Sequence, residues 1–352
     1  MRSIGIIGSG NWGTAIAKVI GENVEKLTAA SASENNMMYN RTVKMYVYEE
    51  LVDNGQKLSE VINKQRENVK YLPGHRLPDC VVASSDITEV SSSSDILFIV
   101  MPHQYLADQC VLMKNSLKPG AFAVSLCKGF MHENEESQVT LISEYISRTL
   151  DIPCHVLMGA SIANEVAAGK FCESTVGSKI LEHGIITKQL VETDYFRVQI
   201  SLCAEIVEIC GAVKNVVAVA AGFCDGLGYG GNTKAAVIRI GLIEMIRFAK
   251  LMYKCTDESV FMESCGVADL IATCYGGRNR KIAEAFVRQK KSIDVLENEL
   301  LNGQKLQGPS TARDMMKLIR SRNVSSEFPL FRAVYEICYE TRPVNSILNA
   351  LI

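Results

Sequence analysis

Three glycines near the N-terminus, Gly8, Gly10 and Gly13, constrain the fold of this chain more than any other feature. They follow the apolar run at residues 3–8, which is typical of a buried parallel strand, and they precede a helical pattern that starts at Thr14. In this context the first glycine makes a tight turn, the second lets the backbone approach a pyrophosphate, and the third allows helix and strand to pack closely. The motif therefore predicts a nucleotide-binding turn rather than a merely structural one.

Short apolar runs alternate with helical stretches through the first two hundred residues. Strands are expected at residues 43–50, 81–84, 96–102, 121–130 and 155–160, and a helix at 133–150. This alternation predicts an α/β fold with a doubly wound, Rossmann-type, mostly parallel sheet. The Asn- and Ser-rich stretch at residues 28–40 is expected to form an exposed loop.

The character of the sequence changes near residue 200. Apolar residues recur at helical spacing from Leu202 to Ala221 and again from Thr233 to Met252. Strand-like alternation does not return, so an all-helical C-terminal domain is expected. We therefore predict a nucleotide-binding domain at 1–200 and a helical substrate and catalytic domain at 201–352, a division that suits the chain length.

Composition and charge exclude several classes of protein. The formal net charge is −2, so no overall field attracts nucleic acid or an anionic membrane. No apolar stretch of about 18 residues is free of charge, so no membrane span is expected. The first residues do not resemble a signal peptide, which favours a cytoplasmic location. The twelve cysteines include no CxxC pair and are interpreted as buried thiols, not as a disulfide or metal framework.

The second predicted strand ends in acidic residues. Glu49 or Glu50 could accept a hydrogen bond from a ribose hydroxyl and would repel a 2′-phosphate, which favours NAD over NADP. A solvated strand end is an equally good interpretation of these two glutamates. Trp12, inside the glycine turn, is interpreted as a packing residue.

Two lysines stand out from the ordinary surface lysines. Lys214 lies in the apolar helical stretch GAVKNVVAVAAG, where burial would lower its pKa into a range useful for proton transfer. The alternative is a lysine whose charged end reaches the surface. Lys128 directly follows the apolar run AFAVSLC of a predicted strand, at the edge of the sheet where ligands bind.

Several polar residues of the C-terminal half could accompany these lysines. Asp269 and Thr273 are four residues apart and share one helix face, although a surface pair is the simpler explanation. Arg278 lies in a Gly-rich loop and is suited to phosphate, but alone it would be an ordinary surface arginine. Residues of similar weight are Asn215, Lys305 and Gln307, and His103 is left open between a base and a ring in a cofactor groove.

Taken together, the motifs resemble one known family. GSGNWGTA, FIVMPHQY, SLCKGF, GASIANEVAAG, EICGAVKNVVAVAAG, GVADLIATCYGGRNRK and GQKLQGPSTA occur in order from residue 8 to 312. They are similar to those of the NAD-dependent glycerol-3-phosphate dehydrogenases, and most of all to the eukaryotic cytosolic branch. The similarity covers about nine-tenths of the chain, and GAVKN and GGRN are its most specific parts.

The resemblance implies a role for each matching residue. The residues implied to bind the cofactor are Gly8, Ser9, Gly10, Asn11, Trp12, Gly13, Tyr48, Tyr105, Lys128, Ala163, Arg278, Lys305 and Gln307. Lys214 is implied as the proton donor and acceptor, with Lys128, Asn215, Asp269 and Thr273 around it. Arg278 and Asn279 are implied to bind the substrate phosphate, and the substrate also contacts Lys128, Lys214, Asp269 and Thr273. Tyr48, Tyr105 and Ser161 depart from the usual family residues, and His103 becomes a groove residue.

The function implied by the resemblance is reversible hydride transfer between NADH and dihydroxyacetone phosphate, giving sn-glycerol 3-phosphate. A cytoplasmic homodimer active in carbohydrate and glycerophospholipid metabolism is expected, with NAD as the cofactor and no metal. Two alternatives are a related two-domain dehydrogenase that acts on a hydroxy acid or a sugar acid, and a sensor that binds NAD without turnover. The full set of lysine, aspartate and arginine argues against the sensor.

Overall fold

The computed structural model describes residues 1–32, 38–52, 55–131, 139–253, 257–301 and 305–351. The chain divides into two compact units. Unit 1 comprises Met1–Cys127, Ile142–Leu157 and Ser161–Ala204, and unit 2 comprises Lys128–Leu141, Met158–Ala160 and Glu205–Ile352.

Unit 1 is built on an eight-stranded sheet with the strand order β10-β9-β8-β5-β4-β1-β2-β3. Its strands are β1 (Arg2–Ile7), β2 (Tyr39–Tyr46), β3 (Val81–Ser84), β4 (Ile96–Ile99), β5 (Phe122–Ser125), β8 (Cys154–Met158), β9 (Cys172–Gly177) and β10 (Phe196–Ser201). β1 pairs in parallel with β2 on one side and with β4 on the other. The strand order therefore reverses at β1, and ligands of such sheets bind beside the carboxyl ends of the strands at this point. The predicted doubly wound sheet is confirmed.

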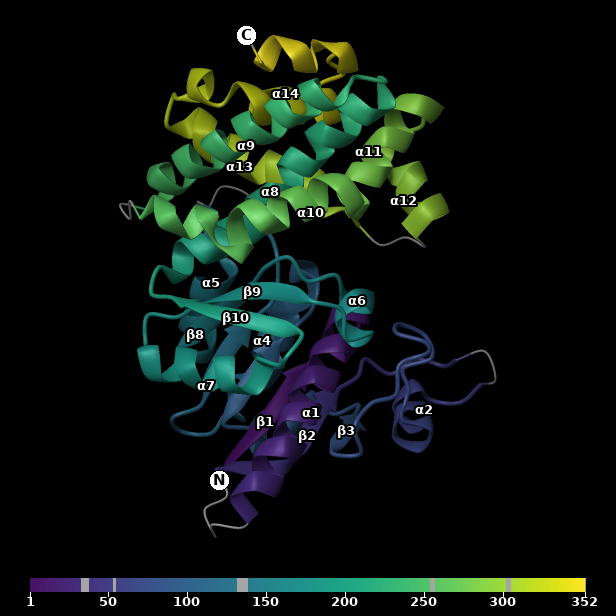
Figure 1. Cartoon of the computed structure of the whole chain (residues 1–352), viewed down its shortest axis with the longest axis vertical. Helices are drawn as coiled ribbons and strands as arrows, with labels where there is room; N and C mark the ends of the chain where they lie inside the picture. The colour runs from purple at the N-terminus through teal and green to yellow at the C-terminus, as the bar shows by residue number, and fades with distance from the viewer. Residues whose placement is uncertain (33–37, 53–54, 132–138, 254–256, 302–304, 352) are drawn as a thin grey trace. The chain divides into compact units, whose positions relative to one another are not determined.

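Helices pack on this sheet in two groups (Figure 1). They are α1 (Asn11–Ala32), α2 (Leu58–Gln65), α3 (Ile87–Ser93), α4 (Leu106–Met113), α5 (Ile142–Leu150), α6 (Ala163–Ala167) and α7 (Leu181–Val191). α1 contacts α6 and α7, whereas α4 contacts α3 and α5. The long helix α1 begins directly after β1, so its N-terminus lies at the carboxyl edge of the sheet.

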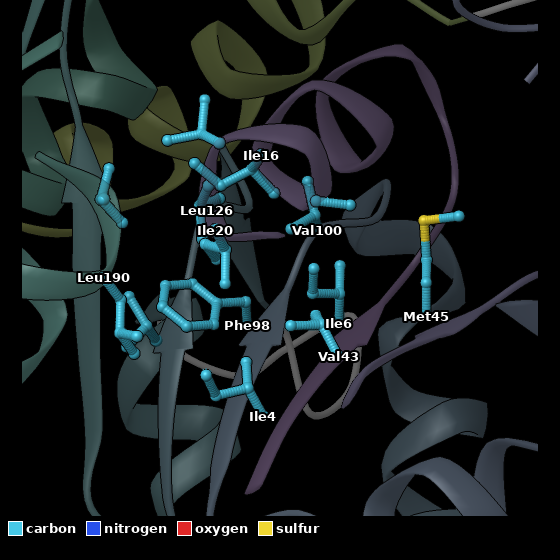
Figure 2. Packing of buried hydrophobic residues seen from close by; sticks show 14 of the residues in the cluster. Ile4, Ile6, Ile16, Ile20, Val43, Met45, Phe98, Val100, Leu126 and Leu190 are labelled. Atoms are coloured by element: carbon cyan, nitrogen blue, oxygen red, sulfur yellow. The ribbon is translucent and has the colours of Figure 1, made fainter. Parts of the chain in front are cut away.

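The core of unit 1 holds β1 and α1 together. Figure 2 shows Ile4 and Ile6 of β1 beside Phe98 of β4, with Ile16 and Ile20 of α1 above them. Each of these side chains is at most 1% exposed. Burying one such side chain contributes about 1.5–3 kcal/mol to the stability of the fold, so the packing of β1 and α1 fixes the turn that joins them.

Unit 1 also contains a pair of histidines, in which His155 is buried and His183 is half-buried. His155 of β8 contacts His183 of α7 through Nε2 and Nδ1 at 2.8 Å, and its own Nδ1 lies 2.9 Å from Ser178 Oγ. Because Ser178 donates its single proton to the Ile180 carbonyl, the proton of neutral His155 belongs on Nδ1. His155 Nε2 then accepts from His183 Nδ1–H. Burial, and next His183, lower the pKa of His155 to about 4.

We expect this histidine pair to make the fold sensitive to acid. An unfolded histidine has a pKa of about 6.5, so between that pH and pH 4 the unfolded chain binds the extra proton and stability falls as the pH falls. At about 1.4 kcal/mol per pKa unit, the loss is on the order of 3 kcal/mol by pH 4. Urea unfolding at a series of pH values should show this decline, and His155→Gln should reduce it. The control His75→Gln should not, and an equal effect in both variants would argue against the account.

Unit 2 is helical apart from one short hairpin within the described residues (Figure 1). Its helices are α8 (Ala204–Gly226), α9 (Gly231–Met252), α10 (Asp269–Gly276), α11 (Arg278–Gln289), α12 (Ile293–Leu301), α13 (Gln307–Ser321) and α14 (Pro329–Tyr339). Shorter 3-10 turns occupy Glu258–Met262, Ser325–Glu327 and Val344–Ala350, and a π-helical turn occupies Ser264–Ala268. The helical C-terminal half that the sequence predicts is confirmed.

Helix α8 is apolar enough, and long enough, to cross a membrane on length and composition alone. Its most apolar window is nonetheless entirely buried within the folded chain, as in the core helix of a soluble protein. Length, composition and burial do not by themselves decide whether a helix crosses a membrane, so the absence of a membrane span stays a prediction.

Some expected element bounds were wrong. Residues 28–32 continue α1 and residues 39–40 begin β2, so only part of the polar stretch is left for a loop, and residues 33–37 lie outside the described part. The expected helix at 133–150 begins only at Ile142. Before it, β7 (Thr140–Leu141) pairs with β6 (Phe130–Met131) in an antiparallel hairpin, and residues 132–138 are not described.

Two strands of the eight-stranded sheet were not expected. β9 (CESTVG) and β10 (FRVQIS) contain polar residues, so neither forms a continuous apolar run like most other strands of the sheet. Both lie at one end of the sheet, and β10 is its edge strand. β10 alternates apolar and polar residues, the local pattern of a strand with one exposed face, whereas pairing with its neighbours makes β9 a strand.

Candidate active site

The glycine turn of unit 1 has two glycines that the fold requires and one that it does not. A Cβ on Gly8 would lie 2.1 Å from the Val100 carbonyl oxygen, and φ at Gly8 is +121°. A Cβ on Gly13 would lie 2.2 Å from the Gly8 carbonyl oxygen. A Cβ on Gly10 would meet nothing within 4 Å. The protein itself leaves space at Gly10, which is where the backbone must approach a pyrophosphate.

The start of α1 offers hydrogen-bond donors to the same space. The first bond of the helix runs from Thr14 N to Gly10 O at 2.9 Å, so the N–H groups of residues 11–13 precede the helical ladder. They lie at the positive end of a 22-residue helix. These groups fit the pyrophosphate of a dinucleotide.

Two side chains fix the shape of this turn. The Ser9 carbonyl accepts from Thr14 Oγ1 at 3.0 Å and from Asn68 Nδ2 at 2.8 Å. Asn68 is fully buried and also donates to Thr14 Oγ1. Asn68 could not be recognised from the sequence, because it lies 59 residues from Ser9 and no local pattern distinguishes it from a loop asparagine.

The other expected cofactor residues of unit 1 lie around the turn or at strand ends. Asn11 Nδ2 donates to the Tyr71 carbonyl and to Asn164 Oδ1, both at 2.8 Å. Trp12 packs against the core, as its interpretation as a packing residue requires. Ala163 is the buried first residue of α6, whereas Tyr48 and Tyr105 are 73% and 62% exposed.

Glu49 and Glu50 both have hydrogen-bond or ion-pair partners within unit 1. Glu49 accepts from the backbone N–H and the hydroxyl of Ser59, and Glu50 forms an ion pair with Lys70. Both carboxylates thus have partners within unit 1 and lie beyond the end of β2 at Tyr46, and the ribose role of either glutamate stays a prediction. Ser161 and His103 are half-buried.

Replacing Gly10 by alanine should affect binding, whereas replacing Gly13 by alanine should affect stability. Gly10→Ala should leave the fold intact and weaken NADH binding by about tenfold or more, because the methyl group fills the space for the pyrophosphate. Gly13→Ala should lower the unfolding midpoint, because its methyl group meets backbone. Thermal unfolding and NADH titration of both variants check this, and normal NADH affinity in Gly10→Ala would contradict it.

In unit 2 the predicted lysine and aspartate form a buried ion pair. Lys214 of α8 is 2% exposed and Asp269, the first residue of α10, is 4% exposed. Lys214 therefore does not reach the surface. Thr273 Oγ1 donates to Asp269 Oδ1 at 3.2 Å, so the four-residue spacing does place the two side chains on one face. The π-helical turn at Ser264–Ala268 directly precedes Asp269, and such turns are frequent at functional sites.

A second lysine lies beside this pair. The amino groups of Lys128 and Lys214 are within hydrogen-bonding reach. Burial first, and then the charge of Lys214, lower the pKa of Lys128 to about 7, while Asp269 acts in the opposite direction. Lys128 gains less from the carboxylate than Lys214 does, because Asp269 pairs directly with Lys214.

Amide side chains connect the lysines to the surrounding helices. Asn279 Nδ2 donates to Asn215 Oδ1 at 3.0 Å, and Asn279 Oδ1 accepts from Gly308 N at 2.8 Å. Gln307 Oε1 accepts from Asn215 Nδ2 at 3.5 Å, and Gln307 Nε2 donates to the Lys128 carbonyl at 3.4 Å. This chain of contacts joins α8, α11 and α13 to Lys128. It also leaves the Asn279 amide engaged at both ends by protein groups.

Two cations complete the set. Arg278 is exposed and is the first residue of α11, and its charge contributes to the lowered pKa of Lys128. Lys305 forms ion pairs with Asp294 at 2.9 Å and with Glu297 at 2.7 Å. The predicted residues of this group all belong to unit 2, and they are Lys128, Lys214, Asn215, Asp269, Thr273, Arg278, Asn279, Lys305 and Gln307.

The two units supply complementary parts of one kind of enzyme. A dinucleotide turn can hold a redox cofactor, and a buried lysine paired with a carboxylate can move a proton to or from a substrate oxygen. This combination defines the class of nicotinamide-dependent oxidoreductases, and comparison with known proteins specifies the family within it.

Two family models match the chain. The NAD-dependent glycerol-3-phosphate dehydrogenase N-terminus matches residues 3–183, and the C-terminus of the same family matches residues 205–349. Cytoplasmic glycerol-3-phosphate dehydrogenase [NAD(+)] of Bos taurus is 52% identical over 351 residues, which cover 99% of this chain and 97% of the relative. The human cytoplasmic enzyme is likewise 52% identical, with the same coverage. The chain belongs to the NAD-dependent glycerol-3-phosphate dehydrogenase family.

Solved structures agree. Glycerol-3-phosphate dehydrogenase of Saccharomyces cerevisiae is 39% identical, with a TM-score of 0.88 and 99% of each chain covered. The enzyme of Plasmodium falciparum is 38% identical, with a TM-score of 0.91, covering 99% of this chain and 94% of that one. The chain is an oxidoreductase that uses NAD, and the names of its mammalian relatives support the expected cytoplasmic location.

Proposed function

We propose that this chain interconverts dihydroxyacetone phosphate and sn-glycerol 3-phosphate through the buried pair of Lys214 and Asp269. That pair is the observation which carries the proposal. Removing two charges from water costs free energy of folding, so a buried ion pair indicates a role beyond stability. NADH, when bound, supplies the hydride that reduces the ketone carbon. The residues of this chain then have to hold the substrate and provide a proton for its oxygen.

Lys214 provides that proton in the proposed mechanism. Its ammonium donates to the ketone oxygen as negative charge develops there, and it takes the proton back in the reverse direction. Lys128 lies beside Lys214 with a pKa lowered to about 7, so it can take up or release a proton next to the donor near neutral pH. Asp269 keeps the amine of Lys214 oriented, and Thr273 holds Asp269 in place.

Arg278 and the N-terminus of α11 would hold the substrate phosphate. The net charge of the chain is −2, so an anionic substrate needs a local cluster of cations. Arg278 offers a guanidinium, and the 12-residue helix that it begins offers backbone N–H groups and a positive dipole. The side-chain amide of Asn279 already has two protein partners, so we assign its contribution to the backbone N–H.

The cofactor roles expected from the family remain proposals residue by residue. Gly8, Ser9, Gly10 and the N–H groups of residues 11–13 would hold the pyrophosphate. Tyr48, Tyr105 and Ala163 of unit 1, and Lys128, Arg278, Lys305 and Gln307 of unit 2, would make the remaining contacts. The functional division at residue 200 is likewise a proposal.

Substrate discrimination tests the proposal. Purified protein should oxidise NADH with dihydroxyacetone phosphate at least a hundredfold more efficiently, by kcat/KM, than with any member of a panel of oxo acids and sugar acids. Preference for an oxo acid would favour a hydroxy-acid or sugar-acid dehydrogenase instead. Binding of NADH without oxidation by any substrate would favour a sensor.

A ketopantoate reductase of Ralstonia eutropha is 14% identical with a TM-score of 0.55, and this likeness shows a shared fold alone.

We also infer that the chain acts as a homodimer in carbohydrate and glycerophospholipid metabolism, without a membrane span. This rests on the family, since dihydroxyacetone phosphate and glycerol 3-phosphate link these two classes of reaction. Sedimentation equilibrium of the purified chain tests the assembly, and a single species of one chain mass would refute the dimer.

A further inference from the structure

One buried carboxylate of unit 2 has no part in the mechanism so far. Glu297, in α12, is 4% exposed, although its neighbours in the sequence ENELL would suggest an ordinary surface helix. Its Oε1 accepts from the backbone N–H of Leu306 at 2.8 Å, and its Oε2 pairs with Lys305 Nζ at 2.7 Å. Both oxygens are thus committed to the short segment that leads into α13.

The position of this segment matters because of the residue that follows it. Leu306 precedes Gln307, the first residue of α13, and no side chain of the segment caps the helix itself. A carboxylate at this point complements the positive end of a 15-residue helix. The Leu306 side chain is packed in a cluster that includes Leu296 and Ile282, so apolar contact and carboxylate hold the segment together.

From Gln307 the contacts continue to the lysine cluster. Its side chain reaches Asn215, the neighbour of Lys214, at 3.5 Å and the Lys128 carbonyl at 3.4 Å. Both distances are at the outer limit for a hydrogen bond. A shift of a few tenths of an ångström at the start of α13 would therefore break them. Glu297 is the polar group that, together with the packing of Leu306, opposes such a shift.

We propose that Glu297 is a positioning residue that holds Lys305 and Gln307 in place for the cofactor and for the lysine cluster. The inference rests on the proposed function, in which Lys305 and Gln307 contact the dinucleotide. Lys305 is 55% exposed in its side chain, so the buried Glu297 fixes the direction in which its amino group is presented. The other partner of Lys305, Asp294, is 82% exposed in its side chain and lies on the same helix, which makes it a matched control.

The test compares Glu297→Gln with Asp294→Asn. We expect the Kd for NADH, read from quenching of the single tryptophan Trp12, to rise about tenfold in Glu297→Gln, in the range found for residues that orient direct ligands. The KM for NADH should rise in parallel, with kcat changed less than about threefold. Asp294→Asn should stay within about twofold, because exposed ion pairs contribute little.

A merely structural role gives a different result. Glu297→Gln would then have a lower unfolding midpoint but an unchanged Kd and KM at temperatures where it is folded, and that outcome would overturn the proposal. So would equal effects in the two variants. If Glu297→Gln does not fold, Glu297→Asp keeps the charge but cannot reach both partners, and a Kd within twofold of the parent would be equally contrary. An inactive parent that binds NADH would refute the proposed function while leaving the Kd comparison valid.

Discussion

Replacement of Lys214 by methionine is expected to lower kcat by about 10²–10⁴-fold, the range that general acid–base groups contribute, while NADH still binds. Methionine has a similar length and is apolar, so it suits a site that is 2% exposed and avoids the cavity that alanine would leave. The variant cannot give a proton to the ketone oxygen. Steady-state rates with NADH and dihydroxyacetone phosphate, together with an NADH titration, measure the two effects separately.

Lys250→Met is the matched control for this variant. Lys250 lies on α9, is 46% exposed in its side chain and pairs with Glu258, so its loss should leave kcat within about twofold. Turnover near that of the parent in folded Lys214→Met would remove Lys214 from the chemistry. Lys128 would then be the candidate to test next, since its pKa lies near 7.

Replacement of Arg278 by methionine should lower kcat/KM for dihydroxyacetone phosphate by about 10²-fold, because hydrogen bonds to charged groups contribute about 1.5–3 kcal/mol each. At saturating NADH, where a weakened cofactor contact no longer limits the rate, the same variant should reduce dihydroxyacetone, which has no phosphate, as well as the parent does. The comparison of the two substrates separates loss of phosphate binding from general damage to the site.

Arg288→Met serves as the control within the same helix. Arg288 is near the other end of α11, is 61% exposed in its side chain and pairs with Glu284, so neither substrate should be affected. An equal loss for the two substrates in Arg278→Met would show that Arg278 supports the site without binding the phosphate.

The parts of the fold that were predictable are those in which neighbouring residues carry the whole signal. β1, the glycine turn and the start of α1 are specified within about a dozen residues, and the structure gives Gly8 and Gly13 the close contacts that the motif requires. β9 could not be found in this way, because it has polar residues such as Glu173 and pairing within the sheet decides its conformation. β10 alternates apolar and polar residues, so its signal lies in that period and not in an apolar run.

Some residues of the site are likewise predictable from their neighbours in the sequence, and others are not. The apolar neighbours of Lys214 predict its burial, and the spacing of Asp269 and Thr273 predicts their hydrogen bond, because both follow from helical geometry. Asn68 and Glu297 act on segments that only the folded chain brings near them, so neither could be recognised. The balance of charge among Lys128, Lys214 and Asp269 also depends on distances and burial that a sequence does not contain.

The most direct measurement is the NADH absorbance of a solution of the purified chain when dihydroxyacetone phosphate is added. The account predicts a steady fall, with one sn-glycerol 3-phosphate formed for each NADH consumed, and almost no fall when Lys214→Met replaces the parent. A constant absorbance with the parent, despite bound NADH, would contradict it.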